Sequence, residues 1–442
     1  MLKTTVISLL LIGVTRAETI SFKNVTLEWK TSTDRNTTTI PSSANLRDNI
    51  PKLQTEISVV LSGLVPVLYP KSVSGVPTLK SLTVSNVGLR EIKPGAIENL
   101  PLLAHLILNR NELKVIERGT FTNLNLTSVN LGDNEISKLE LGAFKNLKIH
   151  HLTLSNNKIS EIRNGTFENV SLQSLNLYGN GLRKIDGPIT NLTNLVLSNN
   201  NLTEIDLHFP DLKYLDLSFN SIQVLKPGDL KNLPALDTLD LTANTLHHVP
   251  EGVFSQSKLV TLKLNYNQIA KIEPKSFDDM SQLSVLHIDH NNLTQWDDKW
   301  LSNSPKLAYI FAGFNRIGAL PGQAFRNYPQ MYSIDLQGNL IKEVSRESFA
   351  GLEKVVNFSL RDNLIVDLDP EWLANATVGS VDLSGNKLGC VEGNLEEAFR
   401  RVDFVHLEGN PWREDCVEKI KTFLSQWPKI KRIVSSVSQQ PI

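Results

Sequence analysis

The chain contains 442 residues, with 45 lysines and arginines against 46 aspartates and glutamates, so its formal net charge is −1. This length allows two or three ordinary domains or one elongated repeat array. Balanced charge, with lysine and arginine spread along the chain, gives no indication of a nucleic-acid partner or of an anionic membrane surface. We therefore expect neither kind of partner.

The first residues have the pattern of a secretory signal peptide. Lys3 supplies a positive charge, residues 6–14 form a short apolar segment, and residues 15–17 offer small side chains at a cleavage site. The apolar segment is too short to span a membrane, and no later stretch reaches that length. We expect removal of residues 1–17, no membrane span, and a secreted, extracellular protein; a buried N-terminal strand is the alternative.

Ten Asn-x-Ser/Thr sequons add to this expectation, because such sites receive N-linked glycans in a secretory compartment. The expected glycosylation sites are Asn24, Asn36, Asn125, Asn164, Asn169, Asn191, Asn201, Asn292, Asn357 and Asn375.

Residues 18–78 are expected to form an N-terminal cap region. Residues 57–61 and 65–70 have the pattern of a degenerate capping strand and first turn. Residues 18–50, rich in Thr, Asn and Ser, predict strand fragments and loop. A cap is required because an open stack of repeats would expose its apolar core.

Repeats follow, with the pattern L-x-x-L-x-L-x-x-N-x-L occurring fifteen times between residues 79 and 410. Most begin 23 or 24 residues apart, but two consecutive repeats, from Leu172 and Leu192, contain only 20. We number positions from the first leucine of each repeat, and place the repeats in residues 79–401 and the last one in residues 402–442. In the repeat from Leu259, positions 4, 6, 9 and 11 are Leu262, Leu264, Asn267 and Ile269.

Each fixed position has a physical reason. One repeat cannot bury its own apolar face, so repeats stack and positions 1, 4, 6 and 11 form a continuous core. Position 9 is Asn in fourteen repeats and Val87 in the first. A buried asparagine at this turn can bond backbone groups of its own and the adjacent repeat, which makes these residues structural. Phenylalanine recurring at position 19 predicts an aromatic spine on the convex side.

This pattern resembles the leucine-rich repeat of extracellular proteins, over about three quarters of the chain. The resemblance implies an α/β solenoid: a curved horseshoe with a concave parallel sheet and N- and C-terminal caps. The repeats are most similar to those of arthropod proteins, including Toll-like ectodomains and mosquito immune proteins. The mosquito proteins are expected to carry a coiled coil and extra cysteines, which this chain lacks.

Residues 402–442 predict the last repeat and a C-terminal cap with an amphipathic helix. Gly-Asn-Pro-Trp at residues 409–412, followed by Cys416, resembles the cysteine-bearing cap of this family, although Glu414 stands where the family has another cysteine. Cys390 is the only other cysteine, and two cysteines in a secreted chain imply one bridge, so we expect a Cys390–Cys416 disulfide. Two free thiols are the alternative. Apolar residues at helical spacing between 417 and 427 predict the helix.

Positions 3, 5, 7 and 8 point away from the core onto the concave face, where they are free to vary and to bind a ligand. In repeats seven to eleven they hold aromatic and histidine residues, which we call the aromatic patch, beside a row of aspartates that includes Asp289. Exposed aromatics on a rigid sheet dominate protein interfaces, whereas local packing of a position-8 ring on the neighbouring loop is the alternative. The expected binding residues are Tyr214, Phe219, Tyr266, His287, His290, Tyr309, Phe311 and Phe314 of the patch, and Asp216, Asp240 and Asp335 of the row.

The sequence gives little indication of catalysis or of a cofactor. His287, Asp289 and His290 are of the types that bind zinc, but a single strand makes them converge poorly, so we expect no metal. No Ser/His/Asp arrangement, paired-carboxylate cleft or glycine-rich phosphate loop stands outside the repeat pattern. We expect a non-enzymatic protein without a cofactor.

The sequence therefore predicts a secreted recognition protein that binds a protein ligand, or else a microbial-surface or glycan ligand, on its concave face, with a role in innate immunity. An adhesion or extracellular-matrix scaffold is the second hypothesis, and a truncated receptor ectodomain is the third. The sequence does not indicate an oligomeric state.

Overall fold

A computed structural model describes residues 19–50, 56–255, 257–301, 303–373, 376–391 and 395–426. The expected signal peptide, the sequon at Asn375 and Trp427 of the expected C-terminal helix lie outside these ranges. The chain divides into two compact units, Met1–Lys148 and Ile149–Ile442, here called unit 1 and unit 2.

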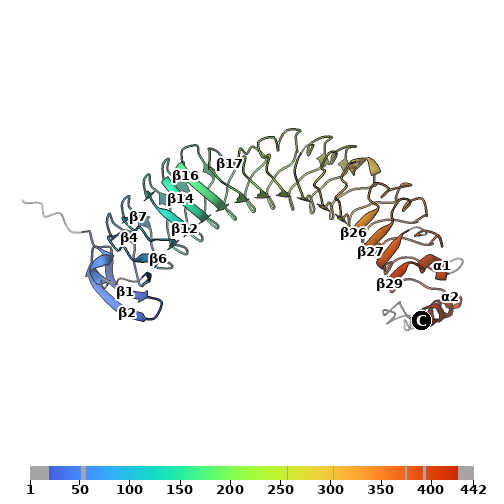
Figure 1. Cartoon of the computed structure of the whole chain (residues 1–442), viewed down its shortest axis with the longest axis horizontal. Helices are drawn as coiled ribbons and strands as arrows, with labels where there is room; N and C mark the ends of the chain where they lie inside the picture. Colours follow the sequence, from blue (N-terminus) through green and yellow to red (C-terminus); the bar gives the residue numbers. More distant parts are fainter. Residues whose placement is uncertain are drawn as a thin grey trace, which may run out of the picture. The chain divides into compact units, whose positions relative to one another are not determined.

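Unit 1 begins with an antiparallel arrangement and continues as a parallel one (Figure 1). β1 pairs antiparallel with both β2 and β3. β3 of the cap then pairs in parallel with β6, followed by β9 and β12, one strand from each repeat. Its elements are β1 (Phe22–Lys30), β2 (Arg35–Ser43), the 3-10 helix η1 (Leu46–Asn49), β3 (Ile57–Ser62), β4 (Val67–Leu68), β5 (Val73–Ser74), β6 (Leu79–Thr83), β7 (Glu91–Ile92), β8 (Ile97–Glu98), β9 (His105–Ile107), β10 (Val115–Ile116), β11 (Phe121–Thr122), β12 (Asn125–Asn130), β13 (Lys138–Leu139) and β14 (Phe144–Thr153), which contains the boundary between the units.

Residues 19–50 differ from the expected strand fragments. They form two regular nine-residue strands, β1 and β2, with Val25 opposite Ile40. Val25, Leu27 and Ile40 are fully buried, whereas the remainder of β2 is polar and mostly exposed. The run Thr37–Thr39 therefore lacks the apolar alternation by which a strand is recognised in a sequence. The structure does place β3 and β4 where the capping strand and first turn were expected.

Unit 2 continues the same arrangement through a parallel ladder that runs from β16 to β29. In Figure 1 the ladder strands of this unit lie on the inner side of the curve that its turns follow. Its elements are β15 (Glu161–Ile162), β16 (Phe167–Asn176), β17 (Lys184–Ile185), β18 (Asn194–Val196), β19 (Tyr214–Asp216), β20 (Thr238–Asp240), β21 (His248–Val249), β22 (Thr261–Lys263), β23 (Lys271–Ile272), β24 (Val285–His287), the 3-10 helix η2 (Asp298–Leu301), β25 (Tyr309–Phe311), β26 (Gln330–Asp335), β27 (Lys354–Ser359), β28 (Thr377–Asp382), α1 (Leu395–Phe399), β29 (Val402–His406) and α2 (Glu414–Gln426).

The core and its polar ladder follow the repeat pattern. In the repeat from Leu259 the position-4 and position-6 leucines are completely buried. Asn291, at position 9 of the next repeat, donates through Nδ2 to the carbonyls of Leu264 and Ile288 at 3.0 and 3.1 Å. Its Oδ1 accepts the backbone N–H of Ile269 at 2.9 Å. Each asparagine thus joins two successive turns, which confirms its structural role.

On the side opposite the ladder, the position-19 rings also follow the repeat pattern. Position-19 rings stack in pairs, with centroids 5.8 Å apart for Phe254 and Phe277 and 5.9 Å for Phe325 and Phe349. The two 20-residue repeats leave out the segment that carries position 19. A hollow of about 130 Å³ lies there, among residues that include Arg183, Leu202 and Leu207.

Helices and a disulfide end the described part of unit 2. Cys390 and Cys416 form the expected disulfide, with their Cα atoms 5.5 Å apart. Helix α2 lies where an amphipathic helix was expected and buries Cys416, Ile420 and Phe423. Sequence reasoning missed α1, whose Phe399 is fully buried with its ring 6.3 Å from that of Phe423.

Candidate functional site

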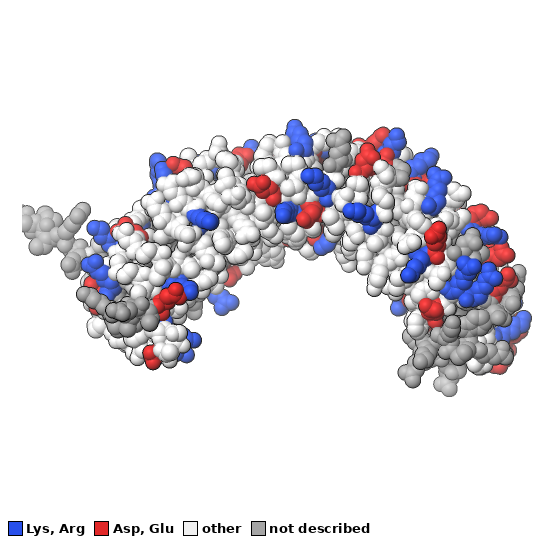
Figure 2. Space-filling model, in the orientation of Figure 1, with Lys and Arg blue, Asp and Glu red and all other residues white. Residues whose placement is uncertain are grey.

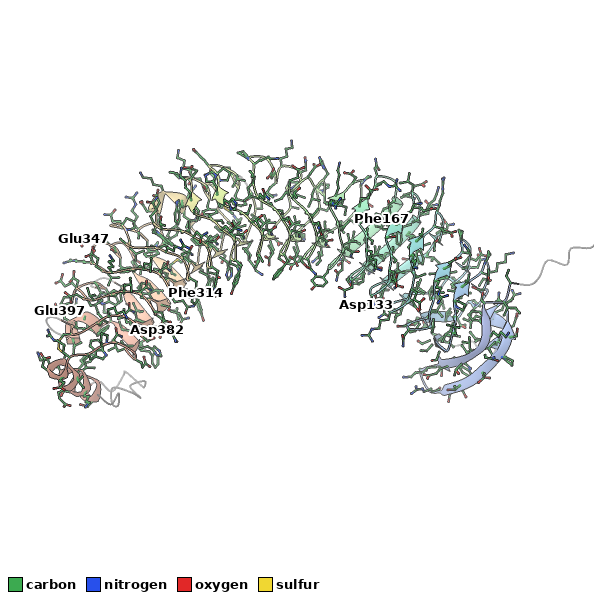
Figure 3. The ribbon with its side chains drawn as sticks, turned by 180° about the vertical axis from the view of Figure 1, so that it is seen from behind. Asp133, Phe167, Phe314, Glu347, Asp382 and Glu397 are labelled. Atoms are coloured by element: carbon green, nitrogen blue, oxygen red, sulfur yellow. A yellow bond between two sulfur atoms is a disulfide. The ribbon has the colours of Figure 1, made fainter. Side chains whose placement is uncertain are left out.

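The aromatic patch lies entirely in unit 2, on the outward positions 3, 5, 7 and 8 of the ladder, here called the strand face. In-register pairing sets position 5 of successive repeats side by side, as Asp216, Asp240, Lys263, His287, Phe311 and Asp335. Figure 3 shows Phe314 and Asp382 on the side of the strands and Glu347 on the opposite side.

The structure brings only some of the predicted patch residues close together. In the position-3 column, Tyr214 and Tyr309 are separated by Thr238, Thr261 and Val285, one from each intervening strand. At about 4.8 Å per strand, the two tyrosines are about 19 Å apart. Tyr214 and Phe219 therefore form one end of the patch, and the remaining members gather at the other.

Two ring stacks form that other end. At position 8, the imidazole of His290 stacks between Tyr266 and Phe314, with centroid distances of 4.1 and 4.4 Å. At position 5, His287 stacks on Phe311 at 4.3 Å. Such offset-stacked pairs add to the stability of the surface and fix the orientation of each ring.

Sequence reasoning missed Tyr332, whose ring lies 4.9 Å from that of Tyr309 and is 49 % exposed. It stands at position 2, which the repeat pattern does not assign to the strand face. Its contact is diagonal, between position 2 of one repeat and position 3 of the preceding one. An aromatic at position 2 beside an aromatic position 3 is the signal that could have revealed it.

Asp289 connects the two stacks. Its Oδ2 lies 2.9 Å from Nδ1 of His290, and its Oδ1 lies 3.5 Å from Nδ1 of His287. Burial raises the pKa of the Asp289 carboxyl, but the two imidazoles outweigh burial, so that its pKa lies below the usual value. The carboxylate therefore stays charged near neutral pH, where it is hydrogen-bonded to His290 and lies within ion-pair distance of His287.

The other aspartates of the row have a local role that sequence reasoning did not assign. Oδ1 of Asp216 accepts the backbone N–H of Ser218 at 2.9 Å, and Asp240 and Asp335 make the same bond to the N–H two residues later. These bonds close the turn at the end of each strand. Among the described residues, only Asp240 of the three pairs with a lysine, Lys263, at 2.9 Å. Burial raises the pKa of Asp335, whose two oxygens accept hydrogen bonds from the uncharged Gln337.

The position-8 residues all have a left-handed backbone. Phe219, Tyr266, His290 and Phe314 have φ between 52° and 54°, and Ala243 in the same column has φ 54°. Other repeats of unit 2 place Gly, Asn or Asp here, which adopt this conformation readily. For other residues it costs about 1–2 kcal/mol. The same conformation recurs at position 8 throughout unit 2, so the turn of the repeat imposes this strain on the four ring-bearing residues.

Gly338 continues the column beyond Phe314. A Cβ atom on Gly338 would stand 2.7 Å from a ring carbon of Phe314, so the ring lies over the bare glycine backbone. Local packing on a neighbouring loop, the alternative for position-8 rings, therefore holds in part for Phe314. Phe219 is 60 % exposed and has no ring partner among the described residues, so local packing covers less than half of this residue.

We expect the Phe219→Gly variant to have a free energy of unfolding higher than wild type by about 0.5–1 kcal/mol, because relief of the left-handed strain exceeds the entropy that glycine gains in the unfolded chain. Urea denaturation followed by tryptophan fluorescence measures this change. A loss of stability would show instead that the Phe219 ring contributes packing to the fold.

Glycan positions bear on access to the strand face. Asn357 is exposed on β27, between Ser333 and Ser380 of the neighbouring strands, as its position in the repeat indicated. Asn164 and Asn169 are exposed, whereas Asn292 is half-buried. A glycan on Asn357 would cover the strand face beyond the eleventh repeat and leave the aromatic patch open.

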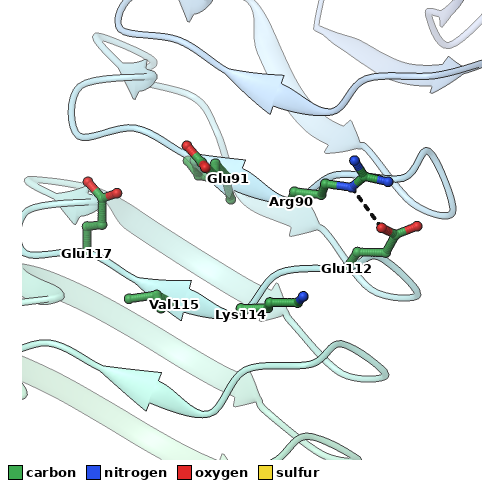
Figure 4. Close-up of a pocket in the computed structure, with 7 residues that line it drawn as sticks. Arg90, Glu91, Glu112, Lys114, Val115 and Glu117 are labelled. Carbon is green, nitrogen blue, oxygen red and sulfur yellow. Dashed lines mark hydrogen bonds and ion pairs between the residues drawn. The ribbon is translucent and has the colours of Figure 1, made fainter.

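A second hollow, in unit 1, measures about 330 Å³ and lies between β7 and β10 (Figure 4). Its lining carboxylates are in ion pairs: Nε of Arg90 lies 2.9 Å from Glu112, and Lys93 bridges Glu91 and Glu117. Lys114 also lines the hollow. Lysines and arginines also intermingle with acidic residues over the face in Figure 2. These paired charges resemble ordinary surface ion pairs more than a binding site.

Within the described ranges, every helix is too short or too polar to cross a lipid bilayer.

Comparisons with known proteins agree with this architecture. A human protein with leucine-rich repeats and immunoglobulin-like domains is 34 % identical over 93 residues, which is 20 % of this chain and 8 % of the relative. Human Toll-like receptor 9 is 51 % identical over 55 residues, 12 % of this chain and 5 % of the receptor. The matched segment thus spans less than a tenth of each relative's length.

Solved structures match much more of the chain. A leucine-rich-repeat protein of Leptospira interrogans aligns with a TM-score of 0.59 and 26 % identity, over 80 % of this chain and 84 % of its own. The Drosophila Toll–Spatzle complex aligns with a TM-score of 0.58 and 21 % identity, over 79 % of this chain and 46 % of that chain, a likeness of fold.

The sequence profile described as "Leucine rich repeat" matches overlapping segments within residues 77–182 and 190–365, more than half of the chain. Members of this family are typically binding scaffolds without catalytic activity, and a non-catalytic binding role is the one that these findings support. The chain belongs to the leucine-rich repeat family and has the repeat architecture of Toll-like ectodomains.

Proposed function

We propose that this protein is secreted and recognises a protein ligand through the aromatic patch on the strand face of unit 2. The observation that carries the proposal is the exposed ring stack at position 8. Tyr266 and Phe314 are 53 % and 45 % exposed, on backbone conformations that are unfavourable for both residues. Rigid, exposed aromatic rings are the side chains that most often dominate the energy of a protein interface.

The chemistry of the patch also favours a protein ligand. The stacks present apolar ring faces, and the aspartates beside them present hydrogen-bond acceptors, so one surface offers both kinds of contact. The segment of 55 residues that is 51 % identical to human Toll-like receptor 9 supports a role in innate immunity. A microbial-surface or glycan ligand is the alternative within the same proposal.

Affinity capture from body fluid with the mature protein tests this function. Combined substitution of Tyr266, Tyr309 and Phe311 by alanine should abolish partner capture and leave secretion unchanged, because all three side chains point outward. A control variant, Tyr178→Ala with Phe404→Ala, removes two exposed rings outside the patch and should retain the partner.

Equal capture by wild type and the patch variant would contradict the proposal. Light scattering supplies a second readout, because self-association that grows with concentration would point to the adhesion scaffold. Sequencing the transcript beyond the codon of Ile442 would test whether a receptor form exists.

A further inference from the structure

The position-8 column contains a gap of one ring. Phe219, Ala243 and Tyr266 occupy it in consecutive repeats, followed by His290 and Phe314. The backbone N–H groups of these residues donate across successive turns at 2.7 to 3.1 Å, so the turns are in register. Ala243 therefore stands where a ring would make the column continuous from Phe219 to Phe314.

The dimensions of this gap suit one planar group. Phe219, Ala243 and Tyr266 have φ values of 53°, 54° and 54°, so their Cα–Cβ bonds leave the backbone in similar directions. At about 4.8 Å per strand, the two flanking aromatic residues are about 10 Å apart. A planar group midway between them would lie about 5 Å from each, within the range of aromatic stacking and of cation–π attraction.

The charge beside the gap is negative. Asp216 and Asp240 stand at position 5 of the repeats that carry Phe219 and Ala243, and each carboxylate bonds the backbone N–H of position 7, next to the ring position. Lys263 pairs with Asp240, whereas the oxygens of Asp216 accept only from Ser218 among the described residues. Of these two carboxylates, the one on Asp216 therefore has no cationic partner among the described residues.

We propose that this gap is a receptor for an arginine side chain of the protein ligand, whose guanidinium inserts between Phe219 and Tyr266 over Ala243. The inference rests on the proposed function and names its partner as a protein with an exposed arginine. A guanidinium is planar, always charged and weakly hydrated, so it stacks on aromatic faces while its N–H groups reach a carboxylate. A lysine ammonium lacks the planar shape, and an uncharged aromatic side chain lacks the charge that Asp216 attracts.

The test uses the full mature protein and five biotinylated nonapeptides that differ only at the central residue: Arg, citrulline, Lys, Trp or Ser. Biolayer interferometry with the peptides on streptavidin tips measures binding. We expect the arginine peptide to bind about tenfold more tightly than the citrulline peptide, which keeps the planar shape without the charge, and more tightly than the other three. Equal binding of the arginine, citrulline and serine peptides would overturn the proposal.

Two variants test the gap itself. Ala243→Phe fills it with a side chain that Phe219 and Phe314 already carry at the same backbone angle, and should abolish arginine selectivity. Asp216→Ser removes the charge and keeps an acceptor for the N–H of Ser218, and should reduce selectivity severalfold. Serine is chosen because asparagine at 216 would create an Asn-Leu-Ser sequon.

Asn199→Phe is the matched control. It adds the same ring at position 8 of the preceding repeat, where φ is 56°, and leaves the gap open, so selectivity should persist. Equal effects of Ala243→Phe and Asn199→Phe would refute the gap. A natural partner that is lost with the patch variant and retained by Ala243→Phe would refute the arginine receptor and leave the proposed function intact.

Discussion

Replacing Asn291 by alanine is expected to lower the free energy of unfolding by roughly 3–4 kcal/mol. The side chain is 6 % exposed and makes three hydrogen bonds through Nδ2 and one through Oδ1. Loss of Oδ1 removes the hydrogen-bond acceptor of the N–H of Ile269, a residue with no exposed surface. A buried, unpaired N–H costs more than a missing bond, which is why we place the effect above that of an ordinary substitution.

The carbonyl groups are less affected than this N–H, because each has two donors. Leu264 O also accepts from Asn267, and Ile288 O also accepts from Asn315. Asn265→Ala is the control: this half-buried asparagine of the strand face makes one described side-chain hydrogen bond, to Thr242, and its loss should cost less than about 1 kcal/mol. Urea denaturation measures both variants, and similar losses for the two would contradict a special role for position 9.

The repeat period predicts a large part of the fold because each turn of the solenoid has the same pattern of buried residues and hydrogen bonds. Burial of position-4 leucines such as Leu262, and bonding by position-9 asparagines such as Asn291, follow from the period alone. The hairpin β1–β2 could not be predicted in this way, since it occurs once and its polar strand lacks alternation. Helix α1 is likewise a single five-residue element without a period to reveal it.

The candidate site was only partly predictable. The period places Tyr266, His290 and Phe314 in one column, and the structure adds that their rings stack. Which rings stack depends on side-chain torsions, which the period does not fix. The turn-closing bond of Asp216 also depends on geometry at the end of the strand, so the sequence suggested only its charge. Occupancy by a ligand remains the proposal that the capture experiment tests.

The second large effect concerns the C-terminal end of the repeats. Replacing Cys390 and Cys416 by alanine should lower the free energy of unfolding by about 3.5 kcal/mol, the value that the chain-entropy relation gives for closing a loop of 26 residues. Alanine suits the buried position of Cys416 better than serine, because it adds no polar group beside Ile420 and Phe423. Denaturant unfolding of the single and double variants gives the three values required.

If the disulfide carries this effect, either single substitution should cost nearly as much as both together, because each one breaks the same bond. Additive costs would instead assign the loss to packing at the two sites. In a repeat protein each turn is stabilised mainly by contacts with its neighbours. The loss of stability should therefore be greatest where the cap covers the last repeat. Hydrogen exchange read by mass spectrometry should therefore show faster exchange in β29 and α2 and little change in β22 and β24. Uniformly faster exchange throughout unit 2 would mean that the unit unfolds as one cooperative block, and that the disulfide stabilises all of it rather than its end.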